Sequence, residues 1–298
     1  MNANKNLYKA AFHATKGNEK CHYANTGFPA LTTCHCACKY GCECAKEGKC
    51  YALLQELQYK DKMKADWENL LLYKEDPEAY KEAVIKFMEE NGEDTLRWFE
   101  SGDSPDKEFF PVVVKGVADV LKDKRFYGYT KEHKEIDFIH DVPVWQWPNV
   151  NLMMSEWGDY KVDEETRKYY KVFKVIPIWE IDEAEAEGYV PCSGNCGDGE
   201  GQCNICKYGT ANVYCVLHGS RAIFPIPEEY KTNEKVDVNT DGFIKFGGKT
   251  IGGLRDAYCK AKKIEGYENR IQALKDCWRM IKNGSITIWK NGFVLKNA

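Results

Sequence analysis

The stretch Thr95-Leu-Arg-Trp-Phe-Glu100, followed at once by Ser101-Gly-Asp-Ser-Pro105, decides the expected fold. The first six residues predict a strand, and the Gly and Pro that follow predict its abrupt end. A second strand is predicted at Arg125–Lys131, with an apolar helix between the two. Further strands are predicted at residues 150–155, 171–176 and 211–217. Because this alternation is typical of βα units, the sequence predicts an α/β fold with a partial or complete parallel βα barrel.

The segments on either side of this alternation predict helices and a second domain. Apolar residues recur at three- and four-residue steps from Tyr51, and Asp76-Pro77 predicts the start of another helix. After residue 218 the pattern changes to two amphipathic helices, 251–262 and 267–281, and a hairpin with an Asn-Gly turn at 286–295. We therefore expect a cysteine-rich βα domain at residues 1–218 and a small C-terminal α+β lobe at 219–298.

The composition limits the classes of protein that fit. The chain has 298 residues and a net charge of −4, which gives no clear signal for nucleic-acid binding. It has no apolar run of about 18 residues that would span a membrane, and no apolar segment of a secretory signal at its N-terminus. Fourteen cysteines in such a chain predict a cytoplasmic protein whose thiols bind metal rather than form disulfides.

Six cysteines crowd into one stretch, which we call the first cysteine loop (residues 34–50). They are Cys34, Cys36, Cys38, Cys42, Cys44 and Cys50. The loop has no Cys-x2-Cys pair, and it holds more thiols than one zinc ion uses. Iron–sulfur clusters take four thiolates from irregular loops. An iron–sulfur cluster is the first interpretation, zinc the second, and redox-active or disulfide-bonded thiols the third.

Four more cysteines form the second cysteine loop (residues 192–206). They are Cys192, Cys196, Cys203 and Cys206. The Cys203-x2-Cys206 pair has a spacing common at metal sites. These thiols either hold a metal centre of their own or complete one begun by the first loop. Cys21, Cys215, Cys259 and Cys277 lie in apolar or helical contexts and are expected to be ordinary buried thiols.

The ends of the predicted strands carry polar residues. In parallel βα folds, chemistry gathers at the carboxyl ends of strands. Ser101, Gly102 and Asp103 follow one strand and Lys131 ends the next, so these four are candidate ligand-binding residues. The alternative is structural, with Ser104 or Asp106 beginning the following helix and Lys131 on the surface.

Taken in order, these motifs resemble a group of mostly phage-encoded proteins related to the radical-SAM barrel enzymes. The matching segments are Thr33–Ala52, Leu96–Asp103, Phe126–Lys131 and Pro191–His218. The resemblance implies a 4Fe–4S cluster, with S-adenosylmethionine as a further candidate cofactor, and it places Ser101-Gly102-Asp103 where the family holds the amino group of that ligand.

One departure from the radical-SAM motif leaves two interpretations open. The family carries Cys-x3-Cys-x2-Cys, but after Cys38-x3-Cys42 the third position is Ala45. A cluster ligated by both cysteine loops, with no open iron, is therefore the alternative to one that binds S-adenosylmethionine.

Two functions remain open from the sequence. The first is a redox or radical enzyme of phage origin, acting on a small molecule in the cytoplasm of a bacterial host. The second is a non-catalytic binding protein, stabilised by iron–sulfur or zinc, that acts on a host or phage partner.

Overall fold

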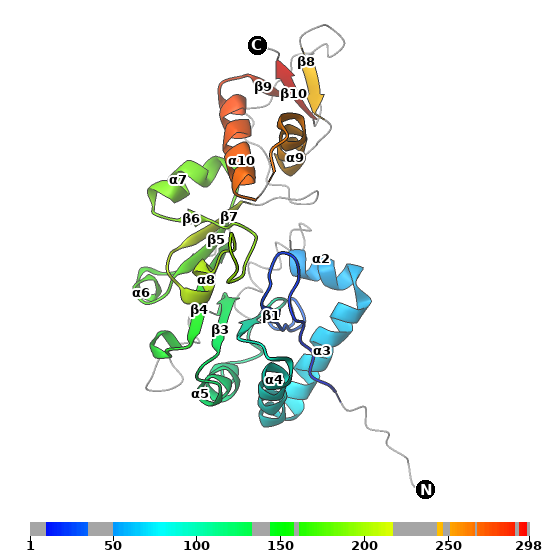
Figure 1. The fold of residues 1–298 in the computed structure, drawn as a ribbon, viewed down its shortest axis with the longest axis vertical. Coiled ribbons are helices and arrows are strands. Elements are labelled where there is room, and N and C mark those ends of the chain that lie inside the picture. The colour runs from blue at the N-terminus through cyan, green and yellow to red at the C-terminus, as the bar shows by residue number, and fades with distance from the viewer. Residues whose placement is uncertain are drawn as a thin grey trace. The chain divides into compact units, whose positions relative to one another are not determined.

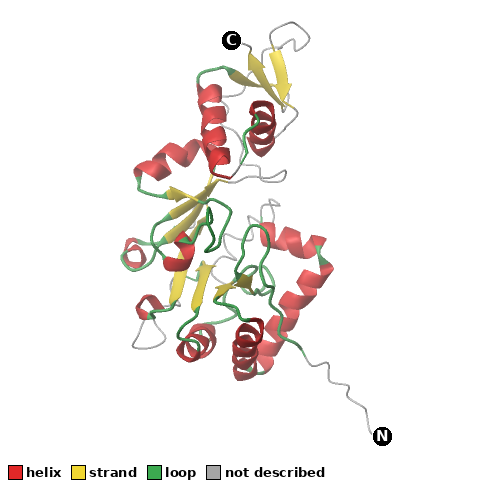
Figure 2. Ribbon diagram, viewed as in Figure 1, coloured by secondary structure: helices red, strands yellow, loops and turns green. Residues whose placement is uncertain are grey.

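Seven parallel strands form one open sheet in the computed structural model of this protein (Figures 1 and 2). Their order is β1-β2-β3-β4-β5-β7-β6. They are β1 (Ala24–Asn25), β2 (Thr95–Trp98), β3 (Arg125–Thr130), β4 (Val150–Trp157), β5 (Val172–Ile176), β6 (Val190–Pro191) and β7 (Val213–Val216). The structure describes residues 10–34, 50–132, 144–157, 161–216, 243–246, 251–265, 267–289 and 292–296. The prediction of a parallel α/β sheet is confirmed.

The sheet does not close into a barrel. Strands β1 and β6 lie at its two edges, and each has only two residues. Closing a barrel requires the edge strands to pair along their length, and two-residue strands offer few hydrogen bonds for that. Of the two predicted architectures, the complete barrel is therefore wrong and the partial parallel fold agrees with the structure.

The chain divides into two compact units. The first unit contains residues 1–173 and 195–212, and the second contains residues 174–194 and 213–298. The second cysteine loop is shared between them, because Cys192 belongs to the second unit whereas Cys196, Cys203 and Cys206 belong to the first.

Three long helices follow the first cysteine loop. They are α2 (Tyr51–Gln58), α3 (Lys60–Glu75) and α4 (Pro77–Asn91). Asp76 begins α4, since its side chain accepts a hydrogen bond from the backbone N–H of Ala79 at 3.0 Å. Pro77 occupies the first helical turn, and Gly92 ends the helix in the left-handed conformation. The predicted helix starts at Tyr51 and Pro77 are both confirmed.

Helix α3 buries polar side chains beside Leu70 and Tyr73, and it exposes other large apolar side chains. Asp66 and Asn69 are buried, whereas Met63, Trp67 and Leu71 are 37%, 41% and 50% exposed. The periodicity therefore predicts the helix correctly but does not identify the face that packs on the protein. The buried face carries a network of hydrogen bonds that is described below.

The two faces of the sheet in the first unit differ in chemistry. On one face, the rings of Trp98 and Phe126 stack, with their centroids 6.3 Å apart, and Trp98 packs edge-on against Phe109 at 5.7 Å. This face is covered by the π-helical segment η1 (Phe110–Lys115) and by α5 (Gly116–Val120). The other face carries Arg97 and Tyr127, which are paired in register on β2 and β3.

Shorter helical segments complete the first unit. They are η2 (Val144–Gln146), α6 (Glu164–Arg167) and α8 (Ile205–Tyr208). Asp163 begins α6, because its carboxylate accepts the backbone N–H of Thr166 at 2.8 Å. The predicted helix through Ile136 and Ile139 lies outside the described residues.

The second unit combines β6 and β7 with helices and a small antiparallel sheet. Its further elements are η3 (Ile178–Glu180), α7 (Ile181–Ala186), β8 (Phe243–Phe246), α9 (Ile251–Lys262), α10 (Tyr267–Lys282), β9 (Ile286–Trp289) and β10 (Gly292–Lys296). Strands β9 and β10 pair antiparallel, which confirms the predicted hairpin. Trp179 and Trp278 pack with their ring centroids 5.9 Å apart, so that η3 and α10 share one apolar core.

No helix in the described ranges combines the length and the apolar character that crossing a membrane requires.

Candidate metal centres

The two described ends of the first cysteine loop, Cys34 and Cys50, lie at the carboxyl ends of the first strands. Both are half-buried free thiols. Burial and, to a smaller extent, the charge of Asp103 together raise the pKa of Cys34 to about 12, and Lys131 opposes them. The charge of Cys50 also raises the pKa of Cys34, by a smaller amount than burial or Asp103. Cys36, Cys38, Cys42 and Cys44 lie outside the described residues.

Asp103 joins the segments at the carboxyl ends of β2 and β3 through hydrogen bonds. Its carboxylate accepts hydrogen bonds from the backbone N–H groups of Ser104 at 2.9 Å and Lys131 at 2.8 Å, and from the hydroxyl of Thr130 at 2.7 Å. Its own backbone N–H donates to the hydroxyl of Thr33 at 3.0 Å. Asp103 therefore connects the end of β2 to the end of β3 and to the residue that precedes Cys34.

The neighbouring predicted residues have distinct partners. The hydroxyl of Ser101 donates to the carboxylate of Glu56 at 2.6 Å. Gly102 has a left-handed φ of 67°. The amine of Lys131 lies 3.3 Å from the hydroxyl of Ser155 on β4. The structure thus brings all four predicted residues to the carboxyl edge of β2 and β3, beside Cys34.

Asp103→Asn is expected to lower the free energy of unfolding by about 1–3 kcal/mol at pH 8, because an amide accepts hydrogen bonds at only one of its two positions. Burial raises the pKa of Asp103 to about 6, opposed by the donor groups of Lys131 and Thr130, so the carboxylate is ionised at that pH. Urea unfolding followed by tryptophan fluorescence measures the change. An unchanged transition would show that these hydrogen bonds contribute nothing to the fold.

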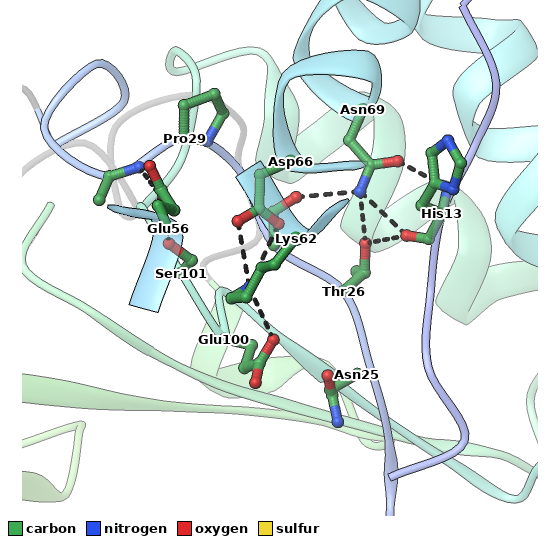
Figure 3. A network of polar contacts seen from close by, with 12 residues as sticks. His13, Asn25, Thr26, Pro29, Glu56, Lys62, Asp66, Asn69, Glu100 and Ser101 are labelled. Atoms are coloured by element: carbon green, nitrogen blue, oxygen red, sulfur yellow. Dashed lines mark hydrogen bonds and ion pairs between the residues drawn. The ribbon is translucent and has the colours of Figure 1, made fainter. Parts of the chain in front are cut away.

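A polar network holds residues 26–30, the segment of the chain that leads towards Cys34 (Figure 3). Glu56 of α2 is buried, and its carboxylate accepts the backbone N–H of Ala30 at 2.7 Å as well as the hydroxyl of Ser101. Lys62 lies between the carboxylates of Asp66 at 3.0 Å and Glu100 at 2.9 Å. Through these hydrogen bonds and ion pairs, helices α2 and α3 therefore hold in place both the segment that follows β1 and the turn that follows β2.

Asp66 and Asn69 complete this network. Burial raises the pKa of Asp66 to about 7, and the nearby charge of Lys62 opposes that rise. The amide of Asn69 donates to the carbonyls of His13 at 2.9 Å and Gly27 at 3.0 Å and to the hydroxyl of Thr26 at 3.1 Å. It also accepts the backbone N–H of His13 at 2.7 Å. Sequence inspection missed these residues, since charged and amide side chains on a helix ordinarily predict a solvent-facing side.

The second cysteine loop pairs with itself and with the segment before β1. The backbone N–H of Cys203 donates to Asn195 O at 2.8 Å, and that of Gly197 donates to Cys203 O at 3.0 Å. These bonds make Cys196 and Cys203 direct neighbours in a parallel bridge, and a second parallel bridge joins Cys21 to Cys196. The structure therefore places Cys21, which the sequence analysis interprets as an ordinary buried thiol, beside two of the predicted ligands.

Aromatic and basic residues of the sheet surround Cys21. Its sulfur lies 3.5 Å from the hydroxyl of Tyr127, and the Arg97 guanidinium lies 5.1 Å from the ring centre of Tyr129. A hydrogen bond with the Cys196 thiol is the main cause that lowers the pKa of Cys21 to about 5. Burial opposes this shift, whereas Tyr127 and Arg97 add to it.

The remaining two cysteines of the second loop lie in different surroundings. Cys206 is buried in α8, and its carbonyl accepts the side-chain amide of Asn151 on β4 at 2.6 Å. Cys192 is in the second unit, where its backbone N–H donates to Tyr214 O of β7 at 2.7 Å.

Thiolates are the ligands that zinc and iron–sulfur clusters prefer, so the chemistry of both loops fits such groups. Over the ranges that the structure describes, no three or more His, Cys, Asp or Glu side chains are grouped as they would be around one metal ion.

Comparison with known proteins identifies a family. The Gene product 88 family matches residues 1–222. The chain belongs to the Gene product 88 family. This assignment agrees with a protein of phage type. The part of the chain that matches Gene product 88 includes both cysteine loops and the whole parallel sheet, and it ends before β8. No curated protein and no solved structure matched the chain in the other two comparisons.

Proposed function

We propose that this Gene product 88 protein is an iron–sulfur protein whose first cysteine loop holds a cluster at the carboxyl ends of β1, β2 and β3. One observation carries the proposal: Thr33, the residue before Cys34, is hydrogen-bonded to Asp103, which in turn binds the backbone of Lys131 at the end of β3. The carboxyl edge of a parallel sheet is where cofactors and substrates usually bind in such folds.

The donor set favours an iron–sulfur cluster over zinc alone. The loop offers six thiols, whereas a structural zinc site closes with four ligands. Cys34 and Cys50 are the described residues that would serve as ligands, and the other four thiols of the loop lie between them in sequence. A bound 4Fe–4S cluster would supply one-electron transfer.

The protein's own residues would set the surroundings of that cluster. Thr33 is held by its contacts with Pro29 and Asp103, which fixes the backbone at the start of the loop. Lys131, close to Cys34, would offset negative charge on thiolate ligands. Ser101 and Asp103 would hold the edge of the site rigid through Glu56 and Thr130.

Two uses of such a centre remain, and one observation favours the second. A radical or redox enzyme would take S-adenosylmethionine or another small molecule at the Ser101-Gly102-Asp103 turn. A binding protein would use the metal only to hold its fold. The carboxylate of Asp103 already accepts three hydrogen bonds from the protein, which supports a structural role for this turn. Calorimetry with S-adenosylmethionine on anaerobic protein separates the two, since binding supports the enzyme and no binding supports the binding protein.

Cys34→Ser and Cys50→Ser are each expected to remove most of the iron and sulfide from anaerobically purified protein and to lower its thermal stability. Both effects should appear together, because metal binding to a loop with little apolar surface contributes to folding free energy. Cys215→Ser is the matched control, since Cys215 is also a half-buried cysteine but lies on β7. Full iron and an unchanged melting transition in both loop variants would contradict the proposal.

A further inference from the structure

Three cysteines from distant parts of the sequence lie side by side on adjacent backbones. The backbone N–H of Cys196 donates to Lys20 O, and that of His22 donates to Cys196 O, both at 2.9 Å. Cys21 is therefore the direct parallel neighbour of Cys196, and Cys196 is in turn the neighbour of Cys203. Residues paired in this way point their side chains to the same side and are separated by about 4.8 Å between backbones.

We propose that Cys21, Cys196, Cys203 and Cys206 form a second thiolate-ligated metal centre, separate from the first cysteine loop. Four thiolates are the complete ligand set of a structural zinc ion or of an iron–sulfur cluster. The inference goes beyond the proposed function, because it concerns other residues and does not require a cluster in the first loop.

Cys206 supplies the fourth thiol. It is buried in α8, and the amide of Asn151 fixes its carbonyl against β4. Helix α8 packs against β3, the strand whose Tyr127 contacts the sulfur of Cys21. The Cys203-x2-Cys206 spacing also places two thiols on one turn, as metal knuckles do.

The backbone around these thiols is already fixed. Asp198 accepts the Tyr23 hydroxyl at 3.0 Å and the Lys207 amine at 2.5 Å, which joins the N-terminal segment to the loop and to the residue that follows it. The described thiols do not yet surround one metal ion. Closing around a metal therefore calls for rotation of cysteine side chains between staggered positions rather than a rearranged backbone.

The surroundings suit an anionic centre. Four thiolates around Zn²⁺ carry a net negative charge, and partly desolvated anions need nearby cations or hydrogen-bond donors. Arg97 acts electrostatically on Cys21, and Tyr127 contacts its sulfur at 3.5 Å. Donors next to a metal centre in this way tune and orient its ligands.

Cys192 is not part of this centre. It belongs to the second unit, and its backbone pairs with Tyr214 of β7. Substitutions of Cys192 and Cys21 therefore distinguish the two assignments. Sequence spacing alone counts Cys192 as a ligand and omits Cys21, whereas the proposal counts Cys21 and omits Cys192.

The test measures zinc, iron and sulfide per chain in full-length protein purified without air, as wild type, Cys21→Ser and Cys192→Ser. Cys21→Ser should lose one zinc ion or one cluster per chain, and Cys192→Ser should keep the wild-type content. Loss of zinc would identify a zinc ion in the centre, and loss of iron together with sulfide would identify an iron–sulfur cluster. Equal contents in wild type and Cys21→Ser, equal losses in both variants, or a Cys21–Cys196 disulfide without metal would overturn the proposal.

A second measurement on wild-type protein does not depend on folding of the variants. Alkylation of thiols, mapped by mass spectrometry before and after removal of metal with a chelator, should show Cys21, Cys196, Cys203 and Cys206 becoming reactive together. Reactivity of Cys21 that is independent of the chelator would contradict the centre. The same measurement in a Cys34→Ser/Cys50→Ser background separates the two sites, because protection of the four thiols should persist there even if the first loop binds nothing.

Discussion

Asn69→Leu is expected to lower the free energy of unfolding by about 3 kcal/mol or more, since each buried polar group left without a partner costs about 1–3 kcal/mol. Leucine nearly matches the shape of asparagine but removes every polar contact of a side chain that is 1% exposed. The backbone N–H of His13 and the carbonyl of Gly27 would lose this partner, and the His13 carbonyl and the Thr26 hydroxyl, which bond to each other at 3.0 Å, would each lose one hydrogen bond. Denaturant unfolding followed by tryptophan fluorescence measures the loss.

Asn269→Leu is the matched control for this substitution. Asn269 is exposed on α10, and its amide contacts only the carbonyl of Glu265 among the contacts that the structure gives for it. Surface substitutions of this kind usually change stability by no more than about 0.5 kcal/mol. Equal effects at both positions would show that the network of Figure 3 does not hold the fold.

Gly102→Ala is the second substitution with a large expected effect. A Cβ atom at Gly102 would lie 2.4 Å from the hydroxyl of Thr33 and 2.6 Å from the carbonyl of Phe28. Its φ of 67° adds about 1–2 kcal/mol of strain for any residue with a side chain. Because Thr33 precedes Cys34, the clash should also reduce the metal content of the first loop.

Gly92→Ala separates the clash from the backbone strain. Gly92 has almost the same left-handed φ, 65°, but nothing lies within 4 Å of a Cβ atom built there. Gly102→Ala should therefore cost about 1–3 kcal/mol more than Gly92→Ala, which is the usual cost of overpacking. Equal losses of stability, with unchanged metal in both, would mean that the turn is free to move away from Thr33.

The strands with strong apolar patterns were predictable from sequence, and the shortest strands were not. Strands β2 and β3 follow the alternation of β-branched, aromatic and polar residues closely. Strand β1 is only Ala24–Asn25, two residues of low strand propensity that pair in register with Leu96 and Arg97. Nothing local predicts such a strand, because the neighbouring strand determines it. The same holds for β6, Val190–Pro191.

The candidate site shows the same limit of prediction from sequence, because local patterns do not reveal pairings with distant residues. Ser101, Gly102 and Asp103 were predictable, since they follow a clear strand and carry turn-forming residues. Cys21 was not, because spacing along the chain cannot show that it pairs with Cys196, 175 residues away. A solitary thiol near an aromatic residue ordinarily indicates packing. Only the backbone pairing separates Cys21 from the other isolated cysteines.

Both cysteine sites depend on the same scaffold but lie on different parts of it. The first loop begins after Thr33, which is hydrogen-bonded to Asp103 beyond the carboxyl end of β2. Cys21 precedes β1 and contacts Tyr127 in the middle of β3. The two proposed sites can therefore be removed one at a time by substitution, so that the metal content predicted for each is separately measurable.

The most direct test of the central claim is the content of iron, acid-labile sulfide and zinc in wild-type protein purified without air. The proposed cluster predicts iron and sulfide in equal amounts, with a brown colour that bleaches on reduction with dithionite. Colourless protein that contains zinc as its only metal, with no sulfide, would contradict an iron–sulfur function for this chain.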